Sequence, residues 1–444
     1  MKKVFRNRLA ATRISLDRLS SYQNLIAMLI PAFYAFLLAS DWWFLRITGV
    51  GDGGITTARK YKDLESIIYG SKCFRSNFLG IYNQTGTREC AVSFNYGVLL
   101  AFLLAFTGVC YLNIYFLGTL AMTISVSGVI YHARKMLAHP EVSKPIVFFS
   151  LISPGFWLLF ERANFDFLML MLLLIAVVLL ERDRTILALL LIACTTLMKF
   201  YTFPVLIIFL IIKWKSIKTW LGCVIALGVF GIVIWNLQLI KAGFIYTWYI
   251  SFGLPIWGQW TNLIIKHKIT DISPIDLKIS YLIGTALFII VFGYNLWKNE
   301  TQPKTLPTVV IINNRYIYYS FIIFGSCFVG CYSFGLNFDY RLVYLAFAVP
   351  FFGLAIKSRV REIRIINVFS LLSIWFSCFS FGLPMAAQTI LQFFGDILLA
   401  VIAPTYLFYI CLIIYRENVT VRKLVDILRN SNLYSTLFAT SSHR

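Results

Sequence analysis

Charge is scarce in this sequence, and negative charge is scarcer than positive. Of its 444 residues 13% are charged, with 19 Asp and Glu against 40 Lys and Arg. Soluble globular proteins usually carry about twice that charged fraction, because their surface must be hydrated. The composition therefore excludes an ordinary soluble globule and indicates an integral membrane protein.

Sequence motifs for metals and nucleotides are missing as well. There is no CxxC pattern, and the four histidines lie far apart, at His132, His139, His267 and His443. We therefore expect no metal site built from protein ligands alone. No Walker loop, GxGxxG or Ser-His-Asp pattern occurs, which argues against nucleotide-driven chemistry.

Apolar segments long enough to cross a bilayer fill most of the chain. Hydrophobic residues make up 59% of it, and the mean hydropathy is +0.78. The apolar runs are continuous rather than alternating, so they predict helices rather than barrel strands. We predict an all-α polytopic membrane protein with about 12 transmembrane helices. One piece within residues 97–160 is expected to be non-spanning or re-entrant.

The predicted organisation is one transmembrane domain, residues 22–415, between two basic amphipathic ends. The ends, residues 1–21 and 416–444, are expected on the cytoplasmic surface. Two long polar loops, residues 41–96 and 240–278, interrupt the apolar runs.

Basic residues give a net charge of +21 but lie in short clusters beside the apolar runs. This distribution is typical of positive-inside topology and of contact with anionic headgroups, so we expect membrane lipids as partners and no nucleic acid. Placing the basic clusters in the cytoplasm brings five polar segments to the opposite face. These are residues 41–96, Glu161–Asp166, Lys199–Pro204, 240–278 and Asn337–Arg341.

The loop 41–96 holds the first candidate residues, including an amphipathic helix expected near Ile55–Tyr69. Asp52 lies among glycines, where its carboxylate could act as a general base or bind a divalent cation on a phosphate. A solvated turn acid is the alternative. Cys73 and Cys90 predict a disulfide if this loop faces an oxidising compartment.

The segment Glu161–Asp166 lies between apolar runs, so its polar side chains are forced to membrane depth. Ionisable groups at that depth are costly and usually functional. Arg162 could bind a phosphate through two hydrogen bonds, or pair with a carboxylate at a helix end.

Lys199 is a lone lysine on the non-cytoplasmic face, which suggests anion binding, with snorkelling as the alternative. Asn337–Arg341 places an amide, an acid, an aromatic ring and a guanidinium on the same face. The aromatic residues within 246–260 could stack on a sugar ring or form an interface belt.

At four of these segments the chain resembles the multi-spanning glycosyltransferases of the GT-C superfamily, in particular glycosyltransferase family 87, a bacterial mannosyltransferase-like group. The matching elements are an acidic first outer loop ending at Asn95-Tyr96; Arg162, Asn164 and Asp166; Lys199, Tyr201 and Pro204; and Asn337, Asp339, Tyr340 and Arg341. Gly97 departs from the group, which usually has proline after Asn-Tyr.

The resemblance implies transfer of a sugar, a hexose such as mannose, from a polyprenyl-phosphate donor to a cell-envelope glycan or lipid acceptor. The reaction would take place at the periplasmic face of the bacterial inner membrane. The family's first-loop aspartate base falls on Asp52, with Asp63 and Asp41 in reserve. Arg162, Lys199 and Arg341 would then hold the donor phosphate.

Two other functions fit the same composition. An O-antigen polymerase or ligase would also need arginines on the outer face. A lipid-linked oligosaccharide flippase or another transporter would need charges along a path through the spans, and Asp396 in the last span favours it.

Overall fold

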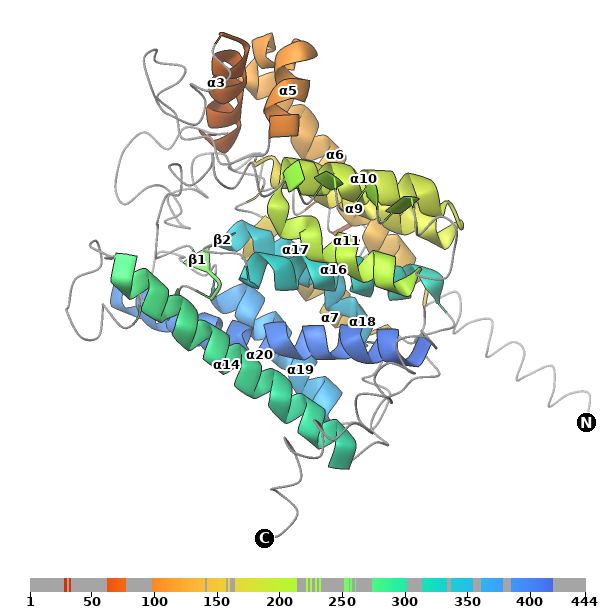
Figure 1. The fold of residues 1–444 in the computed structure, drawn as a ribbon, viewed down its shortest axis with the longest axis vertical. Helices are drawn as coiled ribbons and strands as arrows, with labels where there is room; N and C mark the ends of the chain where they lie inside the picture. The colour runs from red at the N-terminus through yellow and green to blue at the C-terminus, as the bar shows by residue number, and fades with distance from the viewer. Residues whose placement is uncertain are drawn as a thin grey trace, which may run out of the picture.

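The computed structural model describes residues 62–76, 98–139, 142–156, 164–213, 274–301, 314–333, 337–353, 361–377 and 385–417, with single residues or short pieces within 28–32, 159, 221–232 and 251–260. The helices are α3 (Lys62–Ser76), α5 (Val98–Phe106), α6 (Ile114–Leu137), α7 (Lys144–Leu151), α9 (Asp166–Glu181), α10 (Thr185–Met198), α11 (Phe203–Ile212), α14 (Pro274–Thr301), α16 (Arg315–Ser333), α17 (Val343–Ala348), α18 (Pro350–Gly353), α19 (Arg361–Phe376) and α20 (Met385–Glu417). Three 3-10 turns join them: η2 (Val109–Tyr111), η3 (Phe200–Thr202) and η5 (Asp339–Leu342). The predicted helical class is confirmed (Figure 1).

Four helices in the described part of the chain are long and apolar enough to cross a membrane. They cover Ile114–Leu137, Ile279–Lys298, Arg315–Ser333 and Thr389–Arg416. Large apolar side chains of α14 lie exposed along this length, among them Leu282 and Ile290. Such a surface suits lipid rather than water, so the structure supports the predicted membrane character.

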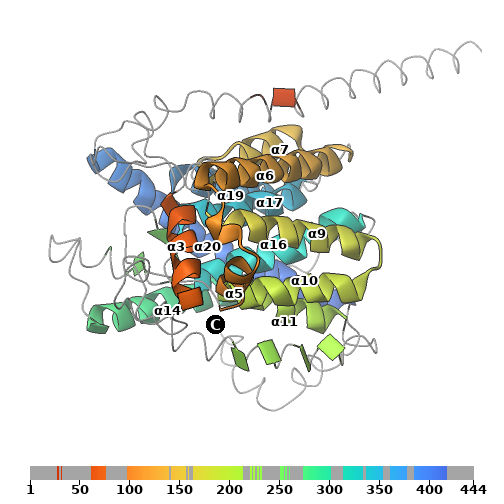
Figure 2. The same cartoon turned by 90° about the horizontal axis from the view of Figure 1, so that it is seen from above.

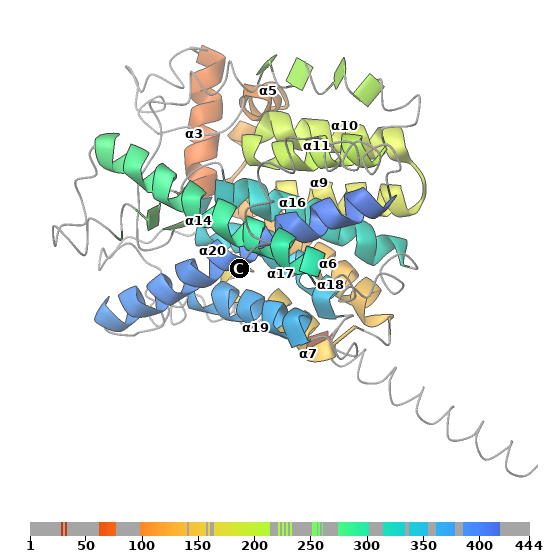
Figure 3. The same ribbon diagram turned by 60° about the horizontal axis from the view of Figure 1, so that its bottom comes forward.

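Helix α16 forms the centre of the bundle, since every residue from Tyr316 to Tyr332 is buried. It packs against α9, α11, α17 and α20. Figure 2 shows α6 and α7 on one side of α16 and α10 and α11 on the other, and Figure 3 shows α14 crossing α20.

Several helix ends that carry basic residues lie together at one end of the bundle, where ion pairs and hydrogen bonds connect them. Lys135 at the end of α6 binds Glu181 at the end of α9, 2.8 Å apart. Arg315 at the start of α16 pairs with Asp183, just beyond α9. Lys213 after α11 donates to Tyr319 of α16 at 3.1 Å. The other ends of α9 and α11 therefore lie together at the opposite end of the bundle.

The region 97–131 divides where the sequence is polar. Asn113 caps α6, because its Oδ1 accepts from the backbone N–H of Tyr115 at 2.8 Å. Before it, the described part of α5 covers the nine residues Val98–Phe106. The non-spanning piece expected within residues 97–160 stays a prediction.

The amphipathic helix of the first outer loop is α3, which begins at Lys62 and continues past the predicted end at Tyr69 to Ser76. Its apolar face, including Leu64 and Ile67, is buried, and α3 packs on α5. In all three overall views α3 runs across the direction of α9, α10 and α16. Residues 55–61 lie outside the described part of the chain.

A short antiparallel pairing joins residues 240–278, the second of the two predicted outer loops and called the second outer loop below, to the segment before Arg341. Ser251 of β1 (Ser251–Phe252) pairs with Phe338 of β2 (Asn337–Phe338). The pairing was not predicted, and it brings two of the five predicted polar segments together.

Candidate functional site

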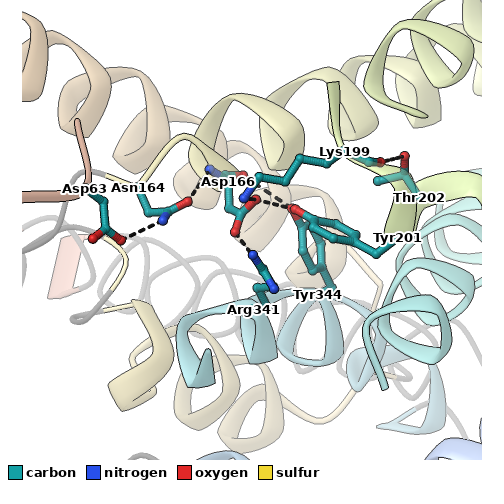
Figure 4. A network of polar contacts seen from close by, with 8 residues as sticks. All are labelled: Asp63, Asn164, Asp166, Lys199, Tyr201, Thr202, Arg341 and Tyr344. Atoms are coloured by element: carbon teal, nitrogen blue, oxygen red, sulfur yellow. Dashed lines mark hydrogen bonds and ion pairs between the residues drawn. The ribbon is translucent and has the colours of Figure 1, made fainter. Parts of the chain in front are cut away.

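The most buried polar cluster of the described residues surrounds Asp166, whose side chain has no solvent exposure. One carboxylate oxygen lies 3.0 Å from Lys199 Nζ and the other 3.0 Å from Arg341 Nε. The hydroxyl of Tyr201 also donates to this carboxylate. Asp166 lies at the start of α9, its partners come from the segment that joins α10 to α11 and from η5, and Figure 4 shows their side chains converging on it. A buried carboxylate without such partners would be strongly unfavourable.

Asn164 links Asp166 to the first outer loop. Its Oδ1 accepts from the backbone N–H of Asp166 at 3.0 Å, which fixes the turn into α9. Its Nδ2 donates to Oδ2 of Asp63, on the first turn of α3, at 2.6 Å. Asp63 is half-buried whereas Asp166 is fully buried, so Asp63 is the more accessible carboxylate of the two.

Lys199 reaches the cluster because α10 ends at Met198. Its backbone is extended, with φ −147° and ψ 119°, before the chain turns into η3. After this break the ammonium group of Lys199 points towards Asp166, and Tyr201, two residues further on in η3, reaches the same carboxylate (Figure 4).

Gly330 of α16 allows this turn to lie against the central helix. A Cβ at this position would overlap the carbonyl oxygen of Tyr201 and lie 3.1 Å from Cγ of Pro204. Close backbone packing between α16 and the Lys199–Pro204 segment therefore depends on glycine.

Aromatic rings form one wall of the cluster. The hydroxyls of Tyr201 and Tyr344 are 3.0 Å apart, and the guanidinium of Arg341 lies over the Tyr201 ring at 5.0 Å. Because its hydroxyl donates to the carboxylate, Tyr201 holds this aromatic wall against Asp166.

The charges at the centre of the cluster are almost fully buried. Lys199 and Arg341 are 4% and 7% exposed, and both contact the carboxylate of Asp166. Burial lowers the pKa of Lys199 to about 8, although attraction to Asp166 and Asp63 opposes that effect. Buried charges of this kind contribute little net stability, so the arrangement favours a functional role.

Residues from four predicted polar segments meet in this cluster: Asp63, Asn164, Asp166, Lys199, Tyr201 and Arg341. The side chains of Asn337, Asp339 and Tyr340 lie outside the described part of the structure, as do Asp41, Asp52, Asn95, Tyr96 and Arg162. Cys73 is disulfide-bonded; Cys90, its predicted partner, is also outside the described residues.

Tyr344 is the member of the cluster that the sequence did not reveal. It stands three residues after Arg341, inside an apolar run, and its hydroxyl also lies 3.4 Å from the backbone oxygen of Asp166. The signal available in the sequence was spacing: Tyr344 follows Arg341 by three residues, which places both on the same face of a helix.

Asp396 of α20 lies apart from this cluster and has partners of its own. It is 1% exposed, and its carboxylate accepts from Trp260 Nε1 at 2.9 Å and from Gln392 Nε2 at 3.5 Å. Trp260 belongs to the second outer loop, so Asp396 ties that loop to α20.

No group of three or more His, Cys, Asp or Glu side chains within the described residues is arranged to hold a metal ion. Comparison of the chain with protein-family models, curated proteins and solved structures finds no significant match. The resemblance to GT-C glycosyltransferases therefore rests on the sequence elements alone, and the function must be argued from the cluster.

Proposed function

We propose that the chain is a membrane glycosyltransferase of the GT-C type that uses a polyprenyl-phosphate sugar as donor. The observation that carries the proposal is the contact network running from Asp63 through Asn164 to Asp166, Lys199 and Arg341. It joins an accessible carboxylate to two buried cations, the two kinds of group that glycosyl transfer from a lipid phosphate requires.

In this proposal Asp63 is the general base. It removes the proton from a hydroxyl of the acceptor, whose oxygen bonds to the anomeric carbon of the donor sugar. The bond between that carbon and the phosphate oxygen breaks, and its electron pair leaves with the polyprenyl phosphate. Asn164 orients Asp63 by donating a hydrogen bond to it.

Lys199 and Arg341 would stabilise the departing phosphate. Both cations lie 3.0 Å from the Asp166 carboxylate, so their positions are fixed before the donor binds. Negative charge grows on the phosphate as the sugar leaves, so fixed cations stabilise the transition state more than the bound donor.

We assign the base to Asp63 because Asn164 connects it to the cluster. Asp52 and Asp41 stay as predictions, since both lie outside the described residues.

The membrane arrangement belongs to the same proposal. Besides the four long helices, shorter apolar helices cover Lys144–Phe156, Thr185–Met198, Phe200–Ile212 and Arg364–Phe376. Together with further apolar runs of the sequence they support about 12 crossings in a GT-C-like fold. Basic residues at the end of the bundle opposite Asp166 support a cytoplasmic side there and a periplasmic site at the bacterial inner membrane.

The transporter alternative rested on Asp396, and its contacts favour another role. Hydrogen bonds from Trp260 and Gln392 engage its carboxylate, as expected of a structural anchor. A cell-envelope polymerase or ligase shares the outer-face arginine and differs in its acceptor.

The test is to profile the glycans of a strain that lacks this protein and is complemented with the wild-type chain or a variant. The amount of each chain in the membrane must be matched. Wild type should restore a missing sugar, whereas Asp63→Asn and Lys199→Gln should not. Arg182→Gln, an exposed cation at the opposite end of the bundle, is the control and should complement fully. Full complementation by Asp63→Asn would refute the assigned base, and an unchanged glycan in the deletion strain would refute transfer to that glycan.

A further inference from the structure

An exposed apolar edge lies beside α3, outside the cluster around Asp166. Phe106 at the end of α5 is 69% exposed, and Tyr111 in η2 is 60% exposed. Their exposed neighbours on α5, after η2 and at the start of α6 are Phe102, Leu103, Leu112, Tyr115 and Phe116. We call this set the α5 edge. Few proteins leave so many large apolar side chains in water, which indicates contact with lipid.

Two cations border the α5 edge. Lys72 Nζ lies over the Tyr69 ring at 5.8 Å and over the Tyr111 ring at 5.7 Å. The Arg75 guanidinium lies over the same Tyr111 ring at 5.6 Å, and its Nη1 donates to the Tyr111 hydroxyl at 3.3 Å. The rings hold both positive charges next to the apolar edge.

The direction of α3 suits a helix that lies in the headgroup region. Helix α3 runs across the direction of the apolar helices α9, α10 and α16, so it lies along the plane of a bilayer that those helices cross (Figure 1). An in-plane helix with cations on one side and apolar neighbours on the other is the usual form of an interfacial element.

We infer that Lys72, Arg75 and Tyr111 bind the phosphate of an anionic phospholipid while the α5 edge enters the acyl region of the same leaflet. Charge complementarity selects this occupant, because two adjacent cations match a headgroup of net negative charge better than a zwitterionic one, whose ammonium group offsets the charge of its phosphodiester. A small water-soluble anion would leave the exposed apolar residues of the α5 edge in water, so it does not fit this surface.

This lipid site is separate from the proposed reaction centre. Lys72 and Arg75 follow Asp63 along the same helix by about 14 and 18 Å. A bound headgroup would hold α3 against the leaflet and so fix the height of Asp63 above the membrane. The inference does not depend on the proposed glycosyltransferase activity.

The experiment is photo-crosslinking of the full chain in nanodiscs that contain phosphatidylcholine and a minor share of phosphatidylglycerol. Phe106→benzoylphenylalanine supplies the photoreactive group, and mass spectrometry of the adducts gives the share of each lipid. In a chain that keeps one of the two cations, we expect phosphatidylglycerol to be enriched about 5-fold over its bulk share. In the wild-type chain, which has both, the enrichment should reach up to about 25-fold.

Lys72→Gln together with Arg75→Gln should return the adducts to the bulk lipid ratio. Lys72→Arg together with Arg75→Lys keeps both charges and should keep the enrichment. Arg182→Gln together with Arg184→Gln removes two exposed cations beyond the far end of α9 and should change nothing.

Three results would overturn the inference. Adducts on the protein's own chain instead of lipid would show that the α5 edge is covered. Absence of enrichment in the wild-type chain would remove the headgroup site, and so would enrichment that survives loss of both cations.

Discussion

Gly330 offers a test of whether the packing of α16 positions the cluster. An added methyl group in Gly330→Ala would overlap the Tyr201 carbonyl oxygen, which belongs to a backbone that cannot swing aside. The turn and α16 would have to separate by about 1 Å, since interiors are close-packed. Tyr201 and Lys199 would move with the turn, away from Asp166.

The size of the effect follows from two opposing contributions. Alanine is preferred over glycine inside a helix by about 1 kcal/mol. Overpacking a buried site typically costs about 1–3 kcal/mol. Gly325, on the same helix, is the matched control, because a Cβ there would lie 3.4 Å from its nearest neighbours, Ile410 and Tyr406.

We therefore expect Gly330→Ala to be less stable than Gly325→Ala by about 1–3 kcal/mol. A displacement of about 1 Å in the site should also lower sugar transfer by about 100-fold. Thermal melting in detergent and transfer assays on both variants measure these effects. Equal melting temperatures and equal transfer in the two variants would refute the positioning role of Gly330.

Three further results are expected. Asp166→Asn leaves two buried cations without their shared carboxylate and should destabilise the protein by about 3–5 kcal/mol; an unchanged melting temperature would contradict this. Because the pKa of Lys199 is about 8, its ammonium form is lost above that pH, so the KM for the donor should rise as pH increases through about 8, and Lys199→Arg should remove this dependence. Trp260→Phe removes the hydrogen bond between the second outer loop and Asp396 and should speed hydrogen exchange in the β1 and β2 segments. Exchange equal to that of the wild-type chain would show that this hydrogen bond does not stabilise the β1–β2 pairing.

The sequence predicted much of the polar cluster because polar residues are conspicuous in an apolar chain. Asp166, Lys199 and Arg341 each interrupt a long hydrophobic run, and only mutual pairing makes such interruptions tolerable in a membrane. The distribution of basic clusters along the chain also predicted that the segments of these three residues share one face. In the structure their side chains are in contact.

Other features could not be predicted because their determinants are long-range. Asp41, Asp52 and Asp63 all lie in the first outer loop, and nothing local indicates that Asp63 is the one bound by Asn164. The β1–β2 pairing involves two residues from each strand, too few for a periodic pattern.

The end of α5 was hidden for a different reason. Gly108, with φ +74°, turns the chain just after this helix. In the sequence it is one small residue within an apolar region whose polar interruption comes slightly later, at Tyr111–Asn113. The end of α5 at Phe106 therefore became visible only in the fold.

The most direct test of the central claim is sugar transfer by the purified full chain in lipid vesicles. A panel of polyprenyl-phosphate donors, labelled in the sugar, would be offered with envelope acceptors. We predict transfer by the wild-type chain and a loss of about 100- to 10,000-fold in Asp63→Asn, as expected for removal of a general base. Asp52→Asn, measured in the same assay, tests the other predicted base. Transfer by Asp63→Asn at the wild-type rate would contradict the account.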